Sequence, residues 1–145
     1  MHFDYCLIDC PPMLGILVVN ALVAGSSLIV PLQTEFMAIA SIDRLLNTLA
    51  MIQRARGLSV PYTIVPTMFD RRTRASRESL ARLRERQDIR LWHEVIPVDT
   101  QLREASRIGT PLTCWQPRAK GSVAYERLVE QLLMLDETTG LRQAG

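Results

Sequence analysis

The chain has 145 residues, of which 48% are hydrophobic and 22% are charged, and its formal net charge is +2. This balance suits one globular domain and leaves little apolar material for a second core. It excludes a membrane-spanning helix, because no apolar run is long enough, and we expect no signal peptide, because no basic region precedes an apolar stretch at the N-terminus.

The three cysteines predict no disulfide framework. Cys6, Cys10 and Cys114 form neither an even set nor a Cys-x-x-Cys pair, which suits a reducing cytoplasm. Cys6 and Cys10 are candidate metal ligands, with His2 as the one nearby imidazole, but core packing is the simpler interpretation.

The first half of the chain predicts strands over residues 3–9 and 27–32 and helices over 16–24 and 42–52. Both strand segments are short apolar runs, which are typical of buried parallel strands, and the first ends in the carboxylate of Asp9. Prolines and a glycine force a turn between this strand and the first helix, which Gly25 closes. Ser41 is expected to cap the second helix and Gly57 to stop it.

The second half predicts strands over residues 62–68 and 91–96 and helices over 73–87, 101–108 and 122–135. Pro66 weakens the regular pairing expected of its strand. Leu80 and Leu83 form a thin apolar stripe on the first of these helices, and the last helix is expected to bury Leu128, Val129, Leu132 and Leu133. Strands that alternate with helices predict an α/β fold with a parallel sheet, in one domain over 3–135 followed by a frayed tail over 136–145.

Charge is distributed unevenly along the chain. Between Arg71 and Arg90 there are eight arginines and only three acids, a local balance of +5, so the remainder carries −3. Such a segment attracts polyanions, although many basic helix faces are simply solvated.

Three polar segments are expected at one edge of the sheet, because ligands of open parallel sheets bind beyond the C-terminal ends of the strands. They are Asp9 with the turn that follows it, residues 67–70, and residues 97–99. An acid after four hydrophobic residues is what a P-loop NTPase uses to hold magnesium. By itself, Asp9 is equally well explained as an ordinary turn or helix-capping residue.

A series of short motifs extends this pattern along the chain. Residues 3–12 read Phe-Asp-Tyr-Cys-Leu-Ile-Asp-Cys-Pro-Pro, which resembles the Walker B region of the ParA/MinD family of partitioning ATPases, and residues 29–36 resemble the strand and loop that follow it in that family. Residues 67–73 match a T-M-(F/Y)-D-x-R-T segment, and 95–97 match the end of the next strand. Three further motifs complete the series in order: Glu-Ala-Ser at 104–106, Gly-Thr-Pro at 109–111 and Lys-Gly-Ser-Val-Ala-Tyr at 120–125. The resemblance therefore spans about residues 3–135.

This resemblance implies ATP and Mg²⁺ as cofactors and assigns expected roles to individual residues. Asp9 is the expected catalytic and metal-orienting carboxylate, and the loop with Pro11, Pro12 and Gly15 is expected to sense the γ-phosphate. The loops that line the adenine are expected to contain Thr67, Met68, Asp70, Pro97 and Asp99. Non-specific DNA is expected to bind Arg71, Arg72, Arg74, Arg77, Arg82, Arg84, Arg86 and Arg103.

The same resemblance implies partners and a location. We expect a homodimer upon ATP binding, a centromere-binding ParB-type protein as partner, no membrane contact, and a cytoplasmic, nucleoid-associated location. The residues near the C-terminus are too few and too polar for the amphipathic targeting helix of MinD relatives. Where family members often carry an arginine this chain has Gln101, with Arg103 two residues later, which weakens the transfer of that one DNA contact.

The phosphate-binding loop of the family has no counterpart in this sequence. That loop requires G-x-x-x-x-G-K-[ST], and the family adds a second lysine near its start, but the only lysine here is Lys120, with no glycine at the required upstream spacing. We therefore expect the C-terminal part of a P-loop NTPase fold, truncated or split, that does not hydrolyse ATP alone. The strand over 3–9 is expected to expose Leu7 and Ile8 at an edge prone to aggregation.

Two other functions remain open. The chain is alternatively a non-catalytic module that binds DNA or a protein partner through its arginine-rich helix. It is also compatible with a relative that positions other cargo, such as septum, secretion or polar machinery.

Overall fold

A computed structural model describes residues 3–11, 15–57 and 60–139, without the side chains of 56 and 135–139. It contains two strands, β1 (Leu28–Gln33) and β2 (Tyr62–Thr67), and the helices α1 (Ile16–Ala24), α2 (Phe36–Arg56), α3 (Arg74–Glu85), α4 (Thr100–Ile108), α5 (Leu112–Trp115) and α6 (Lys120–Thr139). The strands pair in parallel, with Leu28 opposite Tyr62 and Gln33 opposite Thr67. The predicted α/β fold with a parallel sheet is confirmed.

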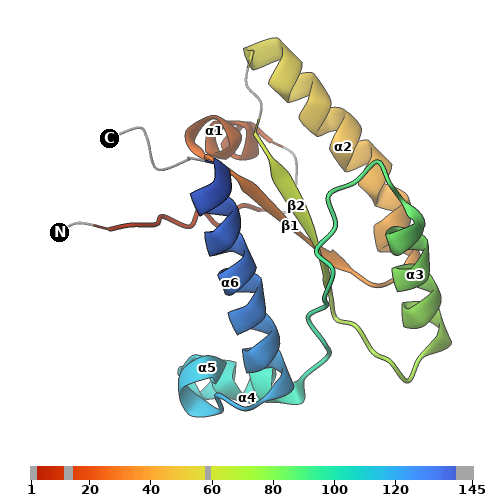
Figure 1. Cartoon of the computed structure of the whole chain (residues 1–145), viewed down its shortest axis with the longest axis vertical. Coiled ribbons are helices and arrows are strands. Elements are labelled where there is room, and N and C mark those ends of the chain that lie inside the picture. The colour runs from red at the N-terminus through yellow and green to blue at the C-terminus, as the bar shows by residue number, and fades with distance from the viewer. Residues whose placement is uncertain (1–2, 12–14, 58–59, 140–145) are drawn as a thin grey trace.

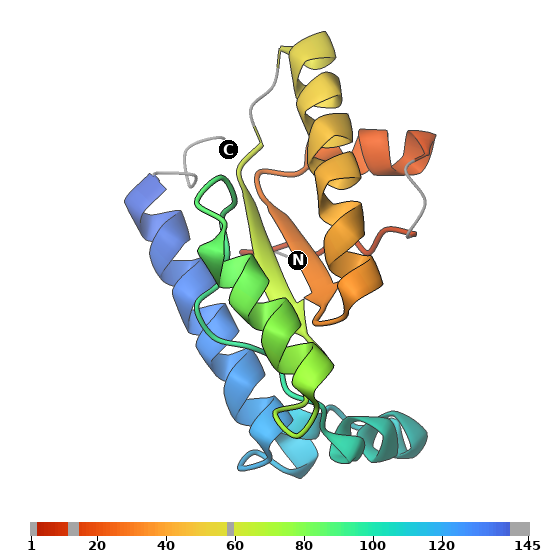
Figure 2. The ribbon, with the colours of Figure 1, turned by 90° about the vertical axis from the view of Figure 1, so that its right-hand side faces the viewer.

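Helices cover both faces of this small sheet (Figure 1). Helices α2 and α3 lie on one face, where they stand in front of the strands in Figure 2. The core on that side consists of Val30, Leu32, Ile42, Ile64 and Leu83. On the other face, α6 packs against a second cluster, which consists of Val65, Trp92, Ile96, Ala124 and Leu128. Apolar side chains on both sides of the strands explain why the strand segments read as continuous hydrophobic runs.

Local signals place most helix ends where the sequence predicts them. Helix α3 begins after Thr73, whose hydroxyl accepts a hydrogen bond from the amide of Ser76. Helices α2 and α4 end at Gly57 and Gly109, both in the left-handed region that favours glycine. The predicted cap at Ser41 is wrong: α2 begins at Phe36, six residues before the predicted start, with Glu35 as its N-cap, and the Ser41 hydroxyl donates to the carbonyl of Ala38 inside the helix.

The strand predicted over residues 3–9 does not form in the described structure. The segment is extended but unpaired, and the side chain of Leu7 is 90% exposed. Cys6 and Cys10 are also exposed, so the expectation that they pack into the core is wrong. A buried strand needs neighbours on its edges and faces, and among the described residues neither strand of the sheet pairs with this segment.

The strand predicted over residues 91–96 is present only as irregular backbone beside β2. One isolated bridge joins it to β2, between Leu91 and Ile64, and a second joins Pro97, just after it, to Phe69 in the turn after β2. The amide of Trp92 donates to the carbonyl of Ile64 at 2.8 Å, and that of Ile96 donates to Pro66 at 2.8 Å. Pro66 thus serves as an acceptor here, and the segment occupies the outer side of β2 without becoming a regular strand.

The last helix begins two residues before the predicted start and buries only part of the predicted stripe. Leu128 is buried and Leu132 half-buried, whereas Val129 and Leu133 are exposed, because the helix rests on the sheet along one narrow face. Helix α6 extends to Thr139, and residues 140–145 of the predicted tail lie outside the described residues. None of the helices in the described ranges combines the length and apolarity that a membrane span requires.

Candidate nucleotide-side loops and basic surface

The turn after β2 is built around a strained backbone position. Met68 has a φ of 54°, in the left-handed region that non-glycine residues rarely adopt. Asp70 follows it, and its carbonyl accepts hydrogen bonds from the backbone and side chain of Thr73, the residue that caps α3. The turn therefore leads directly into α3 and leaves the Met68 side chain partly exposed at the C-terminal end of the sheet.

Two buried hydroxyls hold this turn against the end of β1. The Thr34 and Ser76 hydroxyl oxygens lie 2.7 Å apart, and both residues are buried. Ser76 also accepts a hydrogen bond from the amide of Asp70 at 3.1 Å, and the backbone amide of Thr34 donates to the carbonyl of Thr67 at 3.0 Å. This pair was not predicted from the sequence. The signal available was a serine three residues after a helix-capping threonine, on an otherwise charged helix.

The carboxylate of Asp70 is already engaged by an arginine of the same turn. Arg72 donates to it from its backbone amide at 3.0 Å and from its guanidinium at 2.9 and 2.7 Å. These hydrogen bonds lower the pKa of Asp70 from 3.8 to about 2. The side chain therefore remains charged at neutral pH and is occupied within its own loop.

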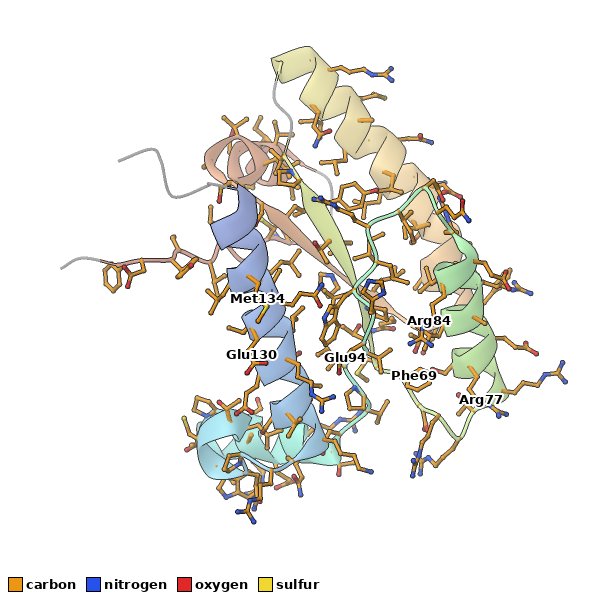
Figure 3. The ribbon with its side chains drawn as sticks, viewed as in Figure 1. Phe69, Arg77, Arg84, Glu94, Glu130 and Met134 are labelled. Atoms are coloured by element: carbon orange, nitrogen blue, oxygen red, sulfur yellow. The ribbon has the colours of Figure 1, made fainter. Side chains whose placement is uncertain are left out.

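The second predicted loop lies directly beside this turn. The amide of Phe69 donates to the carbonyl of Ile96 at 3.1 Å, and its carbonyl accepts from Val98 at 3.0 Å. Pro97 pairs with Phe69 between these two bonds. Figure 3 labels Phe69 at this junction. The structure thus brings residues 67–70 and 97–99 together at the C-terminal end of β2, although they are about thirty residues apart in sequence.

Asp99 is a capping residue for two helices at once. Its Oδ1 accepts from the amide of Gln101 at 3.0 Å, which caps α4. Its Oδ2 accepts from the amide of Gly121, at the start of α6, at 2.9 Å. A Cβ at position 121 would lie 3.4 Å from that oxygen and 3.2 Å from the Leu112 side chain, so glycine permits this close approach. The carboxylate of Asp99 fixes helix positions, which accounts for it without a ligand.

Replacing Asp99 by alanine is expected to destabilise the fold by about 1–3 kcal/mol, because two helix-end amides lose their acceptor. Asp99→Asn retains an acceptor for Gln101 but not a charged partner for Gly121, so we expect an intermediate loss. Urea unfolding followed by circular dichroism measures both. Equal stability of Asp99→Ala and the unmodified chain would show that the two hydrogen bonds contribute nothing.

Asp9 and the segment after it are exposed. Asp9 lies in the unpaired extended stretch, Pro11 ends the described part of that stretch, Gly15 precedes the first turn of α1, and Pro12 lies outside the described residues. Across the described ranges, no group of three or more His, Cys, Asp or Glu side chains is placed to hold a metal ion. For Mg²⁺, Asp9 supplies a single carboxylate, which fits only an ion that is held mainly by water and phosphate oxygens.

The predicted DNA-binding arginines differ in how available they are. Arg71 and Arg77 are exposed and have no ion pair among the described residues. Arg72 and Arg74 are paired with Asp70 and Glu78 but remain highly exposed. These four residues surround the N-terminal end of α3, and Arg77 is labelled there in Figure 3.

The other arginines of the predicted set make structural contacts or lie elsewhere. Arg86 bridges Asp43 of α2, at 2.7 Å, and Asp88, and its side chain is only 24% exposed. These hydrogen bonds raise the pKa of Arg86. Arg84 donates to the carbonyl of His93 at 3.1 Å, and Arg82 lies 5.6 Å from the centre of the Phe36 ring. Arg103 is exposed on α4, outside the basic segment.

Sequence comparison relates the chain to chromosome-partitioning proteins. Residues 1–60 match a family model described as an AAA domain. The Bacillus subtilis protein Soj, a sporulation initiation inhibitor, is 32% identical over 132 residues, which cover 90% of this chain and 52% of Soj. The chromosome partitioning protein ParA of Caulobacter vibrioides is 35% identical over 135 residues, covering 90% of this chain and 49% of that protein.

Comparison with solved structures finds a similar fold in an enzyme that binds a nucleotide analogue. The crystal structure of cobyrinic acid a,c-diamide synthase from Mycobacterium smegmatis with a bound ATP analogue and magnesium superimposes with a TM-score of 0.69. It is 28% identical, and the match covers 91% of this chain and 47% of the enzyme. The chain thus spans about half the length of the relatives that it matches. With the ordered motifs and the parallel sheet, these matches relate the chain to the ParA/MinD-type family of P-loop partitioning ATPases.

Proposed function

We propose that this chain contributes the magnesium- and base-contacting half of a ParA-type ATPase of plasmid or chromosome partitioning, and that it does not hydrolyse ATP alone. The observation that carries the proposal is the contact between the turn at Phe69 and the segment at Pro97, at the sheet edge where such folds bind ligands. The family's phosphate loop has no counterpart here, since Lys120 lies at the start of α6, outside any glycine-rich loop of the required spacing.

The proposal gives roles to Asp9, to the loop after it and to the two loops expected to line the base. Asp9 orients the hydration shell of Mg²⁺, which when bound neutralises charge on the phosphate oxygens. The loop with Pro11, Pro12 and Gly15 responds to the γ-phosphate. At the base, the carboxylates of Asp70 and Asp99 are already engaged, so the contacts come from the partly exposed Met68 side chain and from backbone groups near Thr67 and Pro97.

The N-terminal end of α3 is proposed as the DNA-binding surface. Arg71, Arg72, Arg74 and Arg77 cluster where the helix dipole is also positive, an arrangement that an anion would stabilise. Phosphate neutralisation requires only clustered cations, which fits non-specific DNA. A nucleotide-dependent homodimer, a ParB-type partner and a nucleoid-associated location belong to the same proposal, supported by the partitioning relatives.

An experiment with a completed fold tests the ATPase proposal. The chain is fused to the half of Bacillus subtilis Soj that it does not match, and ATP hydrolysis is measured with and without Mg²⁺. We expect Mg²⁺-dependent hydrolysis by the fusion and none by residues 1–145 alone. Asp9→Ala is expected to abolish the activity, whereas Asp4→Ala, at another exposed acid of the same extended segment, is expected to leave it unchanged.

Two outcomes would contradict this proposal. One is a folded fusion, judged by circular dichroism, that hydrolyses no ATP. The other is equal activity of the Asp9→Ala and Asp4→Ala fusions, which would remove Asp9 from the site.

A second function, a non-catalytic DNA-binding module, is favoured by the same arginine cluster. It predicts salt-dependent DNA binding by residues 1–145 without nucleotide.

A further inference from the structure

Asp70 holds its carboxylate in a fixed place beside the start of α3. Its backbone amide donates to the hydroxyl of Ser76 at 3.1 Å, and its carbonyl accepts from the amide and the hydroxyl of Thr73 at 3.1 and 3.2 Å. The Ser76 hydroxyl is itself held by the buried hydroxyl of Thr34, 2.7 Å away. The backbone around Asp70 is therefore anchored, and only its short side chain is left to move.

Arg72 binds this carboxylate with two nitrogens of its guanidinium group. Its Nε donates to Oδ1 at 2.9 Å and its Nη2 to Oδ2 at 2.7 Å, while its backbone amide adds a bond to Oδ1 at 3.0 Å. Such a forked pair is also how arginine binds phosphate. The Arg72 side chain is 80% exposed and that of Asp70 21% exposed, so the arginine is at the surface while its partner is shielded.

The other arginines near this helix end are held less firmly. Arg74 binds Glu78 through Nε at 2.6 Å, and the Glu78 side chain is 53% exposed. Arg71 and Arg77 make no ion pair within the part of the chain that the structure describes. Arg72 is thus the arginine of this cluster whose charge is most completely matched by a carboxylate.

We propose that Asp70 competes with DNA for Arg72, so that this arginine adds little to DNA affinity while the pair is intact. This inference rests on the proposed DNA-binding role of α3. A phosphate that takes Arg72 must replace charge-assisted hydrogen bonds, and the freed carboxylate then remains close by and repels it. The pKa of Asp70, about 2, means that protonation does not open the pair at neutral pH.

The opposite role would be that Asp70 orients Arg72 toward a phosphate. Nη1 and one hydrogen of Nη2 do remain for a second partner, so the two roles differ chiefly in their electrostatics. Non-specific DNA affinity follows the number of phosphates that cations neutralise, and a matched ion pair has no net charge to contribute. This favours competition, and the two roles predict effects of opposite sign.

Asp70→Asn tests the competition directly. Asparagine keeps an oxygen that accepts from the Arg72 amide, but it carries no charge and binds the guanidinium more weakly. We expect the DNA affinity of residues 1–145 to rise about 2- to 5-fold at about 0.1 M salt. The slope of log affinity against log salt should steepen by about 0.9, as one more phosphate is neutralised. Fluorescence anisotropy of a labelled random-sequence duplex measures both, after circular dichroism has shown that the variant is folded.

Asp88→Asn is the matched control. Asp88 pairs with Arg86, but Arg86 also binds Asp43 at 2.7 Å and so stays paired after the substitution. The twelve residues of α3 place Asp88 about 18 Å from the N-terminal end of the helix, beyond the screening length of about 10 Å at 0.1 M salt. The variant raises the net charge equally without releasing an arginine, so its affinity should change less than about twofold.

Titration of the unmodified chain with the same duplex gives a readout that needs no substitution. Nuclear magnetic resonance follows the Nε–H signal of each arginine side chain. We expect the signals of Arg71 and Arg77 to shift as DNA binds, and that of Arg72, still bonded to Asp70, to shift less.

Weaker DNA binding by Asp70→Asn than by the unmodified chain would overturn the proposal and show that Asp70 orients Arg72. Equal gains from Asp70→Asn and Asp88→Asn would also overturn it, as would an undiminished gain when Arg72→Gln is already present. So would an Arg72 signal that shifts more than those of Arg71 and Arg77. Absence of DNA binding by every variant would contradict the proposed surface itself, whereas binding that Asp70→Asn leaves unchanged would contradict only the competition.

Discussion

Trp92→Ala is expected to lower the free energy of unfolding by about 3–5 kcal/mol. The indole is 1% exposed and lies in the cluster with Val65, Ile96 and Leu128 that joins α6 to the sheet. The truncation leaves a cavity between these two layers. The loss is a large share of the 5–15 kcal/mol that stabilises a typical domain.

The second tryptophan of the chain provides the matched control. Trp115 is 38% exposed on α5 and lies outside both core clusters, so Trp115→Ala should cost less than about 1 kcal/mol. Urea unfolding followed by far-ultraviolet circular dichroism measures both variants without relying on tryptophan fluorescence. Equal losses for the two substitutions would show that Trp92 does not join α6 to the sheet.

The double substitution Arg71→Gln/Arg77→Gln is expected to reduce the dependence of DNA affinity on salt. Each arginine that neutralises one phosphate contributes about 0.9 to the slope of log affinity against log salt, so the slope should fall by about 2. Both side chains are exposed and have no ion pair in the described part of the chain, so little helix stability is lost. Fluorescence anisotropy of a labelled random-sequence duplex, titrated at several salt concentrations, measures this slope.

Arg107→Gln/Arg127→Gln removes the same net charge from other helices and is the matched control. These arginines are paired with Glu104 and Glu94, so their loss should hardly change the slope. Equal slopes for the two double variants would mean that DNA responds only to net charge. Failure of the unmodified chain to bind DNA at low salt would remove α3 as a binding surface for the isolated chain and, with it, the non-catalytic module.

The sequence predicted those elements whose signals are local. Helix α3 was predicted from its composition and from the stripe of Leu80 and Leu83, both of which the structure buries, whereas the Thr73 cap was not predicted. The ends of α2 and α4 follow from Gly57 and Gly109, since few other residues adopt their left-handed backbone without strain. The four-residue helix α5 was not predicted, because so short an element has no periodicity to detect.

The predicted strands that failed depend on neighbours distant in sequence. Residues 3–9 have the composition of a buried strand, but no described strand pairs with them, and Leu7 remains in solvent. Residues 91–96 do run beside β2, yet they join it through one isolated bridge rather than as a strand. Apolar composition alone predicts burial, whereas regular pairing also requires a partner of matching geometry.

In the candidate site, too, some features follow from local sequence and others from contacts between distant residues. The sequence by itself determined which residues carry charge or turn chemistry and that it contains no phosphate loop. It also placed Thr67, Met68, Pro97 and Asp99 at or just after the ends of strand-like segments. Only the tertiary structure decided that the loops containing these residues touch, because backbone bonds between Phe69 and the segment at Pro97 join positions far apart in the chain.

Tertiary structure also decided which charged side chains remain available to a ligand. Asp99 and Arg86 read in sequence as ligand-facing groups, and the fold gives them partners on other helices. The arginines at the start of α3 have partners only within their own segment, or none among the described residues, because that helix end faces solvent. Residue type and order determined the family resemblance and the possible chemistry, while packing determined which side chains remain available for that chemistry.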